Sequence, residues 1–224
     1  VVISPESKYS ASTGGVGTYA NDFVDTLADL GFEVVIVTLL YGSNRNYIME
    51  HYHPRFTGGV VYVNLPLSYQ DGEAAAYGQA ESIAISTAKS GNVNIVYLEN
   101  MFYTDFPYGG LSVEDKLRRS AVFSLGALLA IRRLNIYPSI IQVNEWPTFL
   151  APGYLKIYSE LRQDEHFQNT KIISVLHNPH PGYGLNINES DIAREDYLVK
   201  VAGFDPWRDK GVIKDQENGE LSPM

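Results

Sequence analysis

The sequence predicts an α/β fold: a Rossmann-like, doubly wound domain with a mostly parallel sheet. Short runs of β-branched residues alternate along the chain with longer amphipathic stretches, a pattern typical of βαβ units whose helices pack against a sheet. Each run is almost continuously apolar, as expected for strands that are covered on both faces. The six expected strands fall within residues 1–4, 34–37, 60–63, 95–98, 140–143 and 172–175.

The first helix is expected after the loop that follows the first strand. Tyr19, Phe23, Leu27 and Leu30 recur at steps of four, four and three residues, which predicts one apolar stripe on a helix. Gly31 follows directly and is expected to end this helix, because glycine adopts the left-handed conformation found after helix C-termini.

Two further helices are expected over residues 113–134 and 148–161. The first begins with acidic residues and has Arg132 and Arg133 near its end, the distribution that the helix dipole favours. Residues 42–59 show no clean periodicity, so we expect an insertion or a surface loop there.

Composition restricts the class of partner. The formal net charge is −9, from 17 Lys and Arg against 26 Asp and Glu, which argues against nucleic acid because that affinity comes from clustered cations. The absence of Cys excludes disulfides and thiolate chemistry. No apolar run approaches the roughly 20 residues of a membrane span, and we expect a cytoplasmic protein. His51 and His53 are interpreted as surface residues, and no metal site is predicted.

A glycine-rich turn joins the first strand to the first helix. It runs Ser12-Thr13-Gly14-Gly15-Val16-Gly17, and main-chain amides at a helix N-terminus can face an anionic ligand group. A tight turn without a ligand is the alternative interpretation. A nicotinamide-dependent oxidoreductase is disfavoured, because the spacing is not G-x-G-x-x-G and no acidic residue ends the second strand.

Together with other segments, this turn resembles the opening of the glycogen and starch synthase family. Ser4-Pro5-Glu6 and Thr13-Gly14-Gly15 match the family motifs, with Ser12 at the position of the family's Lys. Residues 138–148, PSIIQVNEWPT, resemble the family's Pro-Asp-Ile-Ile-His-x-His-Asp-Trp-His-Thr, with Glu145 in place of the Asp and Pro147 in place of a His.

Two more segments extend the resemblance. Residues 172–184, IISVLHNPHPGYG, are similar to the family's Thr-Ile-His-Asn-Leu-x-x-Gln-Gly. Residues 106–109, followed by an Arg-rich helix start, look like the family's aromatic loop, in which Tyr103, Phe106 and Tyr108 could line an acceptor groove or pack in the core. The motifs occur in consistent order over nearly the whole chain.

The resemblance implies a function and a domain organisation. Residues 1–224 would form the N-terminal, acceptor-side domain of a two-domain GT-B glycosyltransferase, with the C-terminal nucleotide-sugar domain outside this chain. The whole enzyme would transfer glucose from ADP-glucose or UDP-glucose to an α-1,4-glucan with retention, using no cofactor and no metal. The isolated domain is expected to be inactive, since the groups that hold the nucleotide belong to the other domain.

The resemblance also assigns site residues. His177 would lie over the donor glucose as the catalytic residue, Asn178 would share its pocket, and Glu145 would bind acceptor hydroxyls at a strand end. A helix cap at Glu145 and a structural role for His177 are the alternatives. The full set of residues implied to bind substrate is Ser12, Thr13, Gly14, Gly15, Glu145, Trp146 and Asn178.

Two other functions stay open at this point. One is a carbohydrate-binding or regulatory module that has lost catalysis, which the changes at Ser12 and Pro147 would permit. The other is a different retaining transferase of the same architecture, which makes sucrose, a cell-wall glucan or a glycolipid, and which Val16-Gly17 favours.

Overall fold

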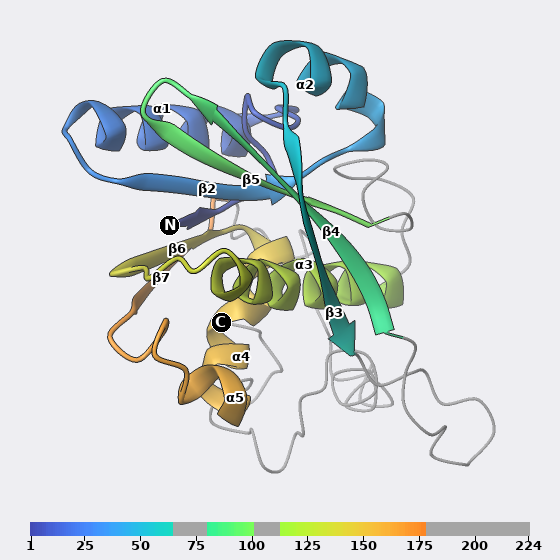
Figure 1. Ribbon diagram of the computed structural model, residues 1–224, viewed down its shortest axis with the longest axis vertical. Helices are drawn as coiled ribbons and strands as arrows, with labels where there is room; N and C mark the ends of the chain where they lie inside the picture. The colour runs from blue at the N-terminus through green and yellow to red at the C-terminus, as the bar shows by residue number, and fades with distance from the viewer. Residues whose placement is uncertain (65–79, 101–112, 178–224) are drawn as a thin grey trace.

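The computed structural model describes residues 1–64, 80–100 and 113–177, which form one α/β unit (Figure 1). The strands of this part make a seven-stranded sheet in the order β3-β4-β5-β2-β1-β6-β7. Strands β5, β2, β1, β6 and β7 are parallel, whereas β4 is antiparallel to both β5 and β3. The predicted fold class is therefore confirmed. The strands are β1 Val2–Ile3, β2 Val34–Leu39, β3 Arg55–Asn64, β4 Ala80–Ser90, β5 Val93–Glu99, β6 Ile140–Asn144 and β7 Lys171–Val175.

Helices cover both faces of the sheet (Figure 1). On one face, α1 (Gly15–Asp29) and α2 (Arg45–Tyr52) enclose a core cluster that contains Val24, Ile36 and Ile48. On the other, α3 (Val113–Arg133) and α4 (Leu150–Ile157) bury the larger cluster. The shorter pieces are the 3₁₀ turns η1 Gly42–Asn44 and η2 Trp146–Thr148 and the one-turn helix α5 Ser159–Arg162.

The stripe of α1 that faces the sheet matches the predicted one only in part. Its buried residues are Val16, Gly17, Ala20, Val24 and Ala28, while Leu30 is 70% exposed. The small residues let the helix approach the sheet closely. Of the expected stripe, Phe23 and Leu27 are partly buried and pack against the same cluster. The helix ends as predicted: the main-chain N–H groups of Gly31 and Phe32 bond back to Ala28 and Leu27, and Gly31 has a φ of +88°.

Two further expectations are corrected, and one strand was not anticipated. Residues 42–59 are not a loop, because they contain η1, α2 and the start of β3. The helix expected over residues 148–161 is divided at Tyr158, which has an extended backbone between α4 and α5. Strand β4 was not predicted, since Ile83 and Ile85 are its only fully buried apolar side chains and small or polar residues surround them.

The outer strands are also less covered than predicted. Strand β3 lies at the edge of the sheet, and its Phe56, Val60 and Tyr62 are exposed, as is Ile173 in β7 at the opposite edge. Burial on both faces holds for the central strands β1, β2 and β5.

Candidate functional site

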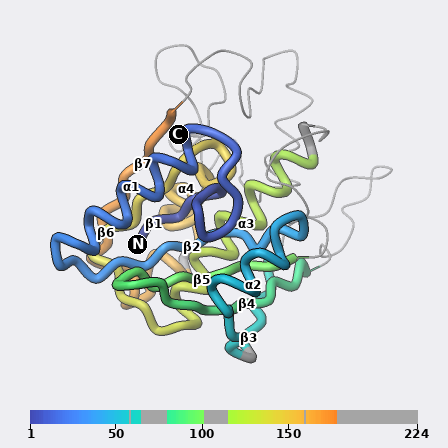
Figure 2. Tube along the Cα trace, turned by 90° about the horizontal axis from the view of Figure 1, so that it is seen from above, coloured from blue at the N-terminus to red at the C-terminus, as the bar shows by residue number. Residues whose placement is uncertain are grey.

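The candidate site lies at the edge of the sheet where the parallel strands end. The loop after β1, the residues after β6 and the end of β7 meet there with the N-terminus of α1, as ligand sites of open α/β sheets do. In Figure 2 the orange end of β7 lies beside α1, and the rings of His177 and Tyr19 are in contact, with their centroids 4.6 Å apart.

Glu6 shapes the glycine-rich turn. Its side chain is buried, and its Oε2 accepts hydrogen bonds from the Thr13 main-chain N–H (2.7 Å), the Thr13 hydroxyl (3.0 Å) and the Gly14 main-chain N–H (3.2 Å). Gly14, the residue that precedes α1, has no side chain to cap the helix. The Glu6 carboxylate therefore supplies the negative charge that a helix N-terminus favours.

From the sequence, Glu6 was recognised only as part of the Ser4-Pro5-Glu6 motif, and no role was predicted for it. Its link to residues 13 and 14 depends on how the loop folds back, and the path of that loop is fixed by distant groups. Tyr41 donates its hydroxyl to the carbonyl of Pro5 at 2.8 Å, and Thr38 donates to the hydroxyl of Ser10 at 2.8 Å. Burial raises the pKa of Tyr41, which keeps this hydroxyl a donor.

Most residues of the turn are exposed. Ser12, Thr13, Gly14 and Gly15 are all exposed, which keeps them available to a ligand. Gly17 is different: a Cβ there would lie 2.4 Å from Oγ and 3.0 Å from Cα of Ser12. The helix and the turn can meet this closely only because residue 17 has no side chain.

Glu145 stands directly after β6 in a strained conformation. Its φ of 63° and ψ of 165° fall in a region that only glycine adopts readily, at a cost of about 1–3 kcal/mol for other residues. Its main-chain N–H donates to Val175 at 3.0 Å, and its carbonyl accepts the Thr148 N–H at 3.0 Å. These bonds hold the strained residue in place, and such outliers are typical of functional sites.

The side chain of Glu145 is fully buried and points to the end of β7. Its Oε1 accepts the main-chain N–H of His177 at 2.6 Å. The structure therefore brings these two predicted site residues into direct contact. Glu145 does not cap the next helix through its side chain. Trp146, which was also predicted to bind substrate, is 7% exposed and packs in the larger core cluster.

His177 is half-buried and held on two sides. Besides the bond from its main chain to Glu145, its ring packs edge-on against Tyr19 at an interplanar angle of 63°. Its Nε2 is buried and has no hydrogen-bond partner among the residues that the structure describes. The neighbouring Asn178, like Tyr103, Phe106 and Tyr108, lies outside the described residues.

A polar network lies beneath this ring. Tyr19 accepts a hydrogen bond from the Gln142 amide at 3.3 Å, and the same amide donates to Asn144 at 3.2 Å. Asn144 donates in turn to the carbonyl of Ile3 at 3.3 Å, which connects the ends of β1 and β6. Sequence reasoning placed Tyr19 in the stripe toward the sheet and missed this role, although its place one turn into the helix after the glycines was a usable signal.

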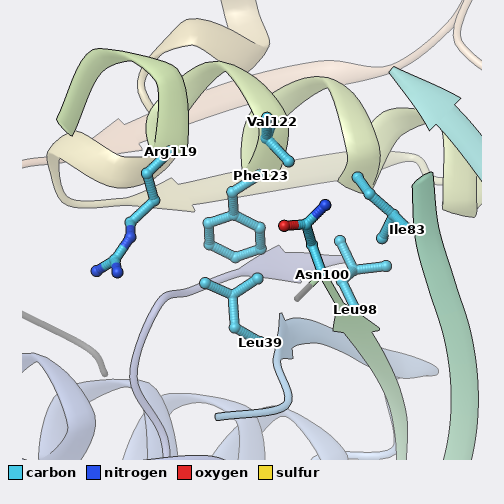
Figure 3. A pocket seen from close by; sticks show the side chains of 7 residues that line it. All are labelled: Leu39, Ile83, Leu98, Asn100, Arg119, Val122 and Phe123. Atoms are coloured by element: carbon cyan, nitrogen blue, oxygen red, sulfur yellow. The ribbon is translucent and has the colours of Figure 1, made fainter. Parts of the chain in front are cut away.

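A small cavity lies nearby, between α3 and the ends of β2 and β5. Figure 3 shows Leu39 and Phe123 facing each other, with Arg119 and Asn100 on either side. Its volume is about 10 Å³, which is too small for a sugar ring and at the lower limit for one water molecule. This cavity is a packing detail of the sheet edge, and the candidate site is the surface formed by the turn, Tyr19 and His177.

Residues 1–64, 80–100 and 113–177 contain no group of three or more His, Asp or Glu side chains arranged to hold a metal ion. Within the same ranges, no helix has both the length and the apolar character needed to cross a membrane.

Comparisons with known proteins show the family of the chain. A family model described as "Starch synthase catalytic domain" matches residues 1–219. The chain is 31% identical over 159 residues to the glycogen synthase of Myxococcus xanthus, which covers 69% of this chain and 30% of that protein. It is 27% identical over 218 residues to the glycogen synthase of Thermotoga petrophila, which covers 96% of this chain and 42% of that protein.

A solved structure gives the same fold. It is the catalytic domain of starch synthase IV from Arabidopsis thaliana bound to ADP and acarbose, with a TM-score of 0.67 and 17% sequence identity, covering 99% of this chain and 41% of that one. The fold is thus that of a Rossmann-like domain of the GT-B type. The chain belongs to the starch synthase catalytic domain family. It spans less than half the length of these relatives.

Proposed function

We propose that this chain is the N-terminal, acceptor-side domain of a retaining glucosyltransferase that transfers glucose from ADP-glucose or UDP-glucose to an α-1,4-glucan. The observation that carries the proposal is the contact of Glu145 and Tyr19 with His177 beside the glycine-rich turn. The relatives named glycogen synthase and the related structure that holds ADP and acarbose support this choice of donor and acceptor.

The chemistry assigns a role to each part of the site. During glucosyl transfer, negative charge builds on the leaving diphosphate and positive charge on the sugar, so the site must supply preorganised dipoles around a shielded sugar. The exposed turn, Ser12 to Gly15, would lie against the donor. His177 would lie over the donor glucose, and Asn178 would extend the same pocket. A C-terminal domain would hold the nucleotide.

Binding to the acceptor is the direct test. Titration calorimetry of the chain with maltooligosaccharides should give a saturable signal. Because the glucan end that accepts glucose must lie beside the donor glucose, His177→Ala should weaken this binding by about tenfold, equal to about 1.4 kcal/mol. His51→Ala is a matched control, because His51 lies exposed on α2 and should leave binding unchanged. Absence of binding to every α-glucan would argue against an acceptor domain of this type.

Activity needs a second measurement. The purified chain should show no transferase turnover, and fusion to the C-terminal domain of a related glycogen synthase should produce it. Turnover by the chain alone would refute the division of labour between the two domains.

One observation favours a second candidate, a carbohydrate-binding or regulatory module without catalysis. The amides of Thr13 and Gly14 already donate to the Glu6 carboxylate, and Ser12 stands where the resemblance expects a Lys. Glucan binding by the chain without turnover by the fusion would select this candidate.

A further inference from the structure

We propose that Glu145 is a positioning residue that holds His177 in place through its main chain, and that it does not itself bind acceptor hydroxyls. This inference deepens the proposed function and rests on it for the role of His177 in the site. The observation behind it is the direct hydrogen bond between these two predicted site residues, which have 31 residues between them in the sequence.

The first argument is accessibility. The Glu145 residue exposes none of its surface, whereas Ser12 to Gly15 are exposed at the same edge of the sheet. A sugar hydroxyl could reach the Glu145 carboxylate only after a rearrangement of this edge. The carboxylate instead accepts a hydrogen bond from the His177 N–H at 2.6 Å.

The second argument is that Glu145 holds the end of β7 at two points. Its main-chain N–H donates to the carbonyl of Val175, the last residue of β7, and its side chain accepts from His177 two residues later. The parallel pairing of β6 with β7 ends at Asn144 and Val175. The side chain of Glu145 thus continues the attachment of the chain to β6 beyond the end of the strand pairing.

The third argument is the backbone. Glu145 has a φ of 63° and a ψ of 165°, and this turn directs its side chain back toward β7. Glycine would adopt the same backbone without strain but has no carboxylate. The strained backbone therefore indicates that the Glu145 side chain is needed for a specific contact, which is its bond to His177. The Tyr19 ring on the other side of His177 completes the placement of the imidazole.

Amide NMR spectra of the ¹⁵N-labelled chain test the proposal without any ligand. In the native chain, the His177 amide proton should resonate downfield and exchange slowly. In Glu145→Gln, this proton should move upfield and the ring proton signals of His177 should shift, while the melting temperature stays within a few degrees. Glu50→Gln, on the exposed side of α2, is the matched control and should leave both signals in place.

The outcomes separate the alternatives. An unchanged His177 amide in Glu145→Gln, together with lost maltooligosaccharide binding, would show direct substrate contact and overturn the proposal. If Glu145→Gln fails to fold, the native spectrum decides, since an ordinary, rapidly exchanging His177 amide also overturns it. A chain that binds no α-glucan while the His177 signals respond as expected would count against the proposed function and leave this inference standing.

Discussion

Glu6 Oε2 accepts the Thr13 main-chain N–H at 2.7 Å, and this bond joins the end of β1 to the turn that starts α1. The two residues are seven positions apart, so the loop between them is closed on itself. The buried carboxylate of Glu6 thus fixes the backbone of the glycine-rich turn, which the sequence predicts to be a ligand-binding surface.

Removal of the Glu6 side chain should therefore destabilise the chain. Glu6→Ala leaves the amides of Thr13 and Gly14 without their acceptor and the first turn of α1 without a negative charge. We expect a loss of about 1–2 kcal/mol, the usual cost of a lost helix cap. Urea unfolding followed by circular dichroism measures it. Glu33→Ala, at an exposed position before β2, should change the midpoint little, and equal midpoints for both variants would contradict the role of Glu6.

A glycine pair offers a test of the turn geometry. Gly17→Ala should displace Ser12, because the added Cβ would lie 2.4 Å from its Oγ and 3.0 Å from its backbone Cα. Gly15→Ala adds the same methyl group where nothing lies within 4 Å, and alanine is a better helix former than glycine. We expect Gly17→Ala to lower the melting temperature and to weaken any donor or glucan binding. Gly15→Ala should not lower the melting temperature. Equal thermal stability of the two variants would show that the turn adapts freely.

The acid stability of the chain should depend on Asp164. Burial alone would raise the pKa of this carboxyl, but hydrogen bonds from the main chain and ring of His166 and the charges of His166 and Arg132 together lower it. Because the folded pKa is below the unfolded value of about 3.9, the stability from Asp164 is present above that pH and is lost as pH falls through the folded pKa.

Asp164→Asn should accordingly lower stability at neutral pH and flatten the loss of stability below about pH 4. Denaturant midpoints measured between neutral and acid pH give both quantities. Asp22→Asn, on the exposed side of α1, is the control and should keep the steep acid dependence. The same steep dependence in Asp164→Asn would mean that other carboxyls carry the acid response.

Elements whose burial follows from their own residues could be predicted from the sequence, whereas elements that depend on tertiary packing could not. The central strands were predicted because a buried parallel strand needs apolar residues at nearly every position, as residues 34–37 and 95–98 have. Strand β4 was missed because it buries one face only, with Ile83 and Ile85 alternating among small and polar residues. The stripe of α1 was predicted only in part: Phe23 and Leu27 pack against the core, but close packing favours small residues such as Ala20 and Ala28 at the fully buried positions.

In the candidate site, too, the positions of residues along the chain could be predicted, but their contacts could not. The positions of Glu145 and His177 at the ends of strands follow from the chain order, so the sequence could place them at one edge of the sheet. Their mutual contact and the bond from Glu6 to Gly14 depend on side-chain directions in the folded chain. The strained backbone of Glu145 could not be predicted either, since nothing local favours it at a glutamate.

That strain can be measured by comparing two variants of one residue. Glu145→Ala and Glu145→Gly both remove the carboxylate and its bond to His177, and they differ only in whether residue 145 has a Cβ. Because the φ of 63° and ψ of 165° suit glycine alone, Glu145→Gly should be the more stable of the two by about 1–3 kcal/mol. At an unstrained position the order would reverse, since alanine reduces the entropy of the unfolded chain relative to glycine. Chemical unfolding of both variants decides between these orders. A more stable Glu145→Ala would mean that the backbone at residue 145 relaxes without the carboxylate, so that the contact with His177 is itself the cause of the strain.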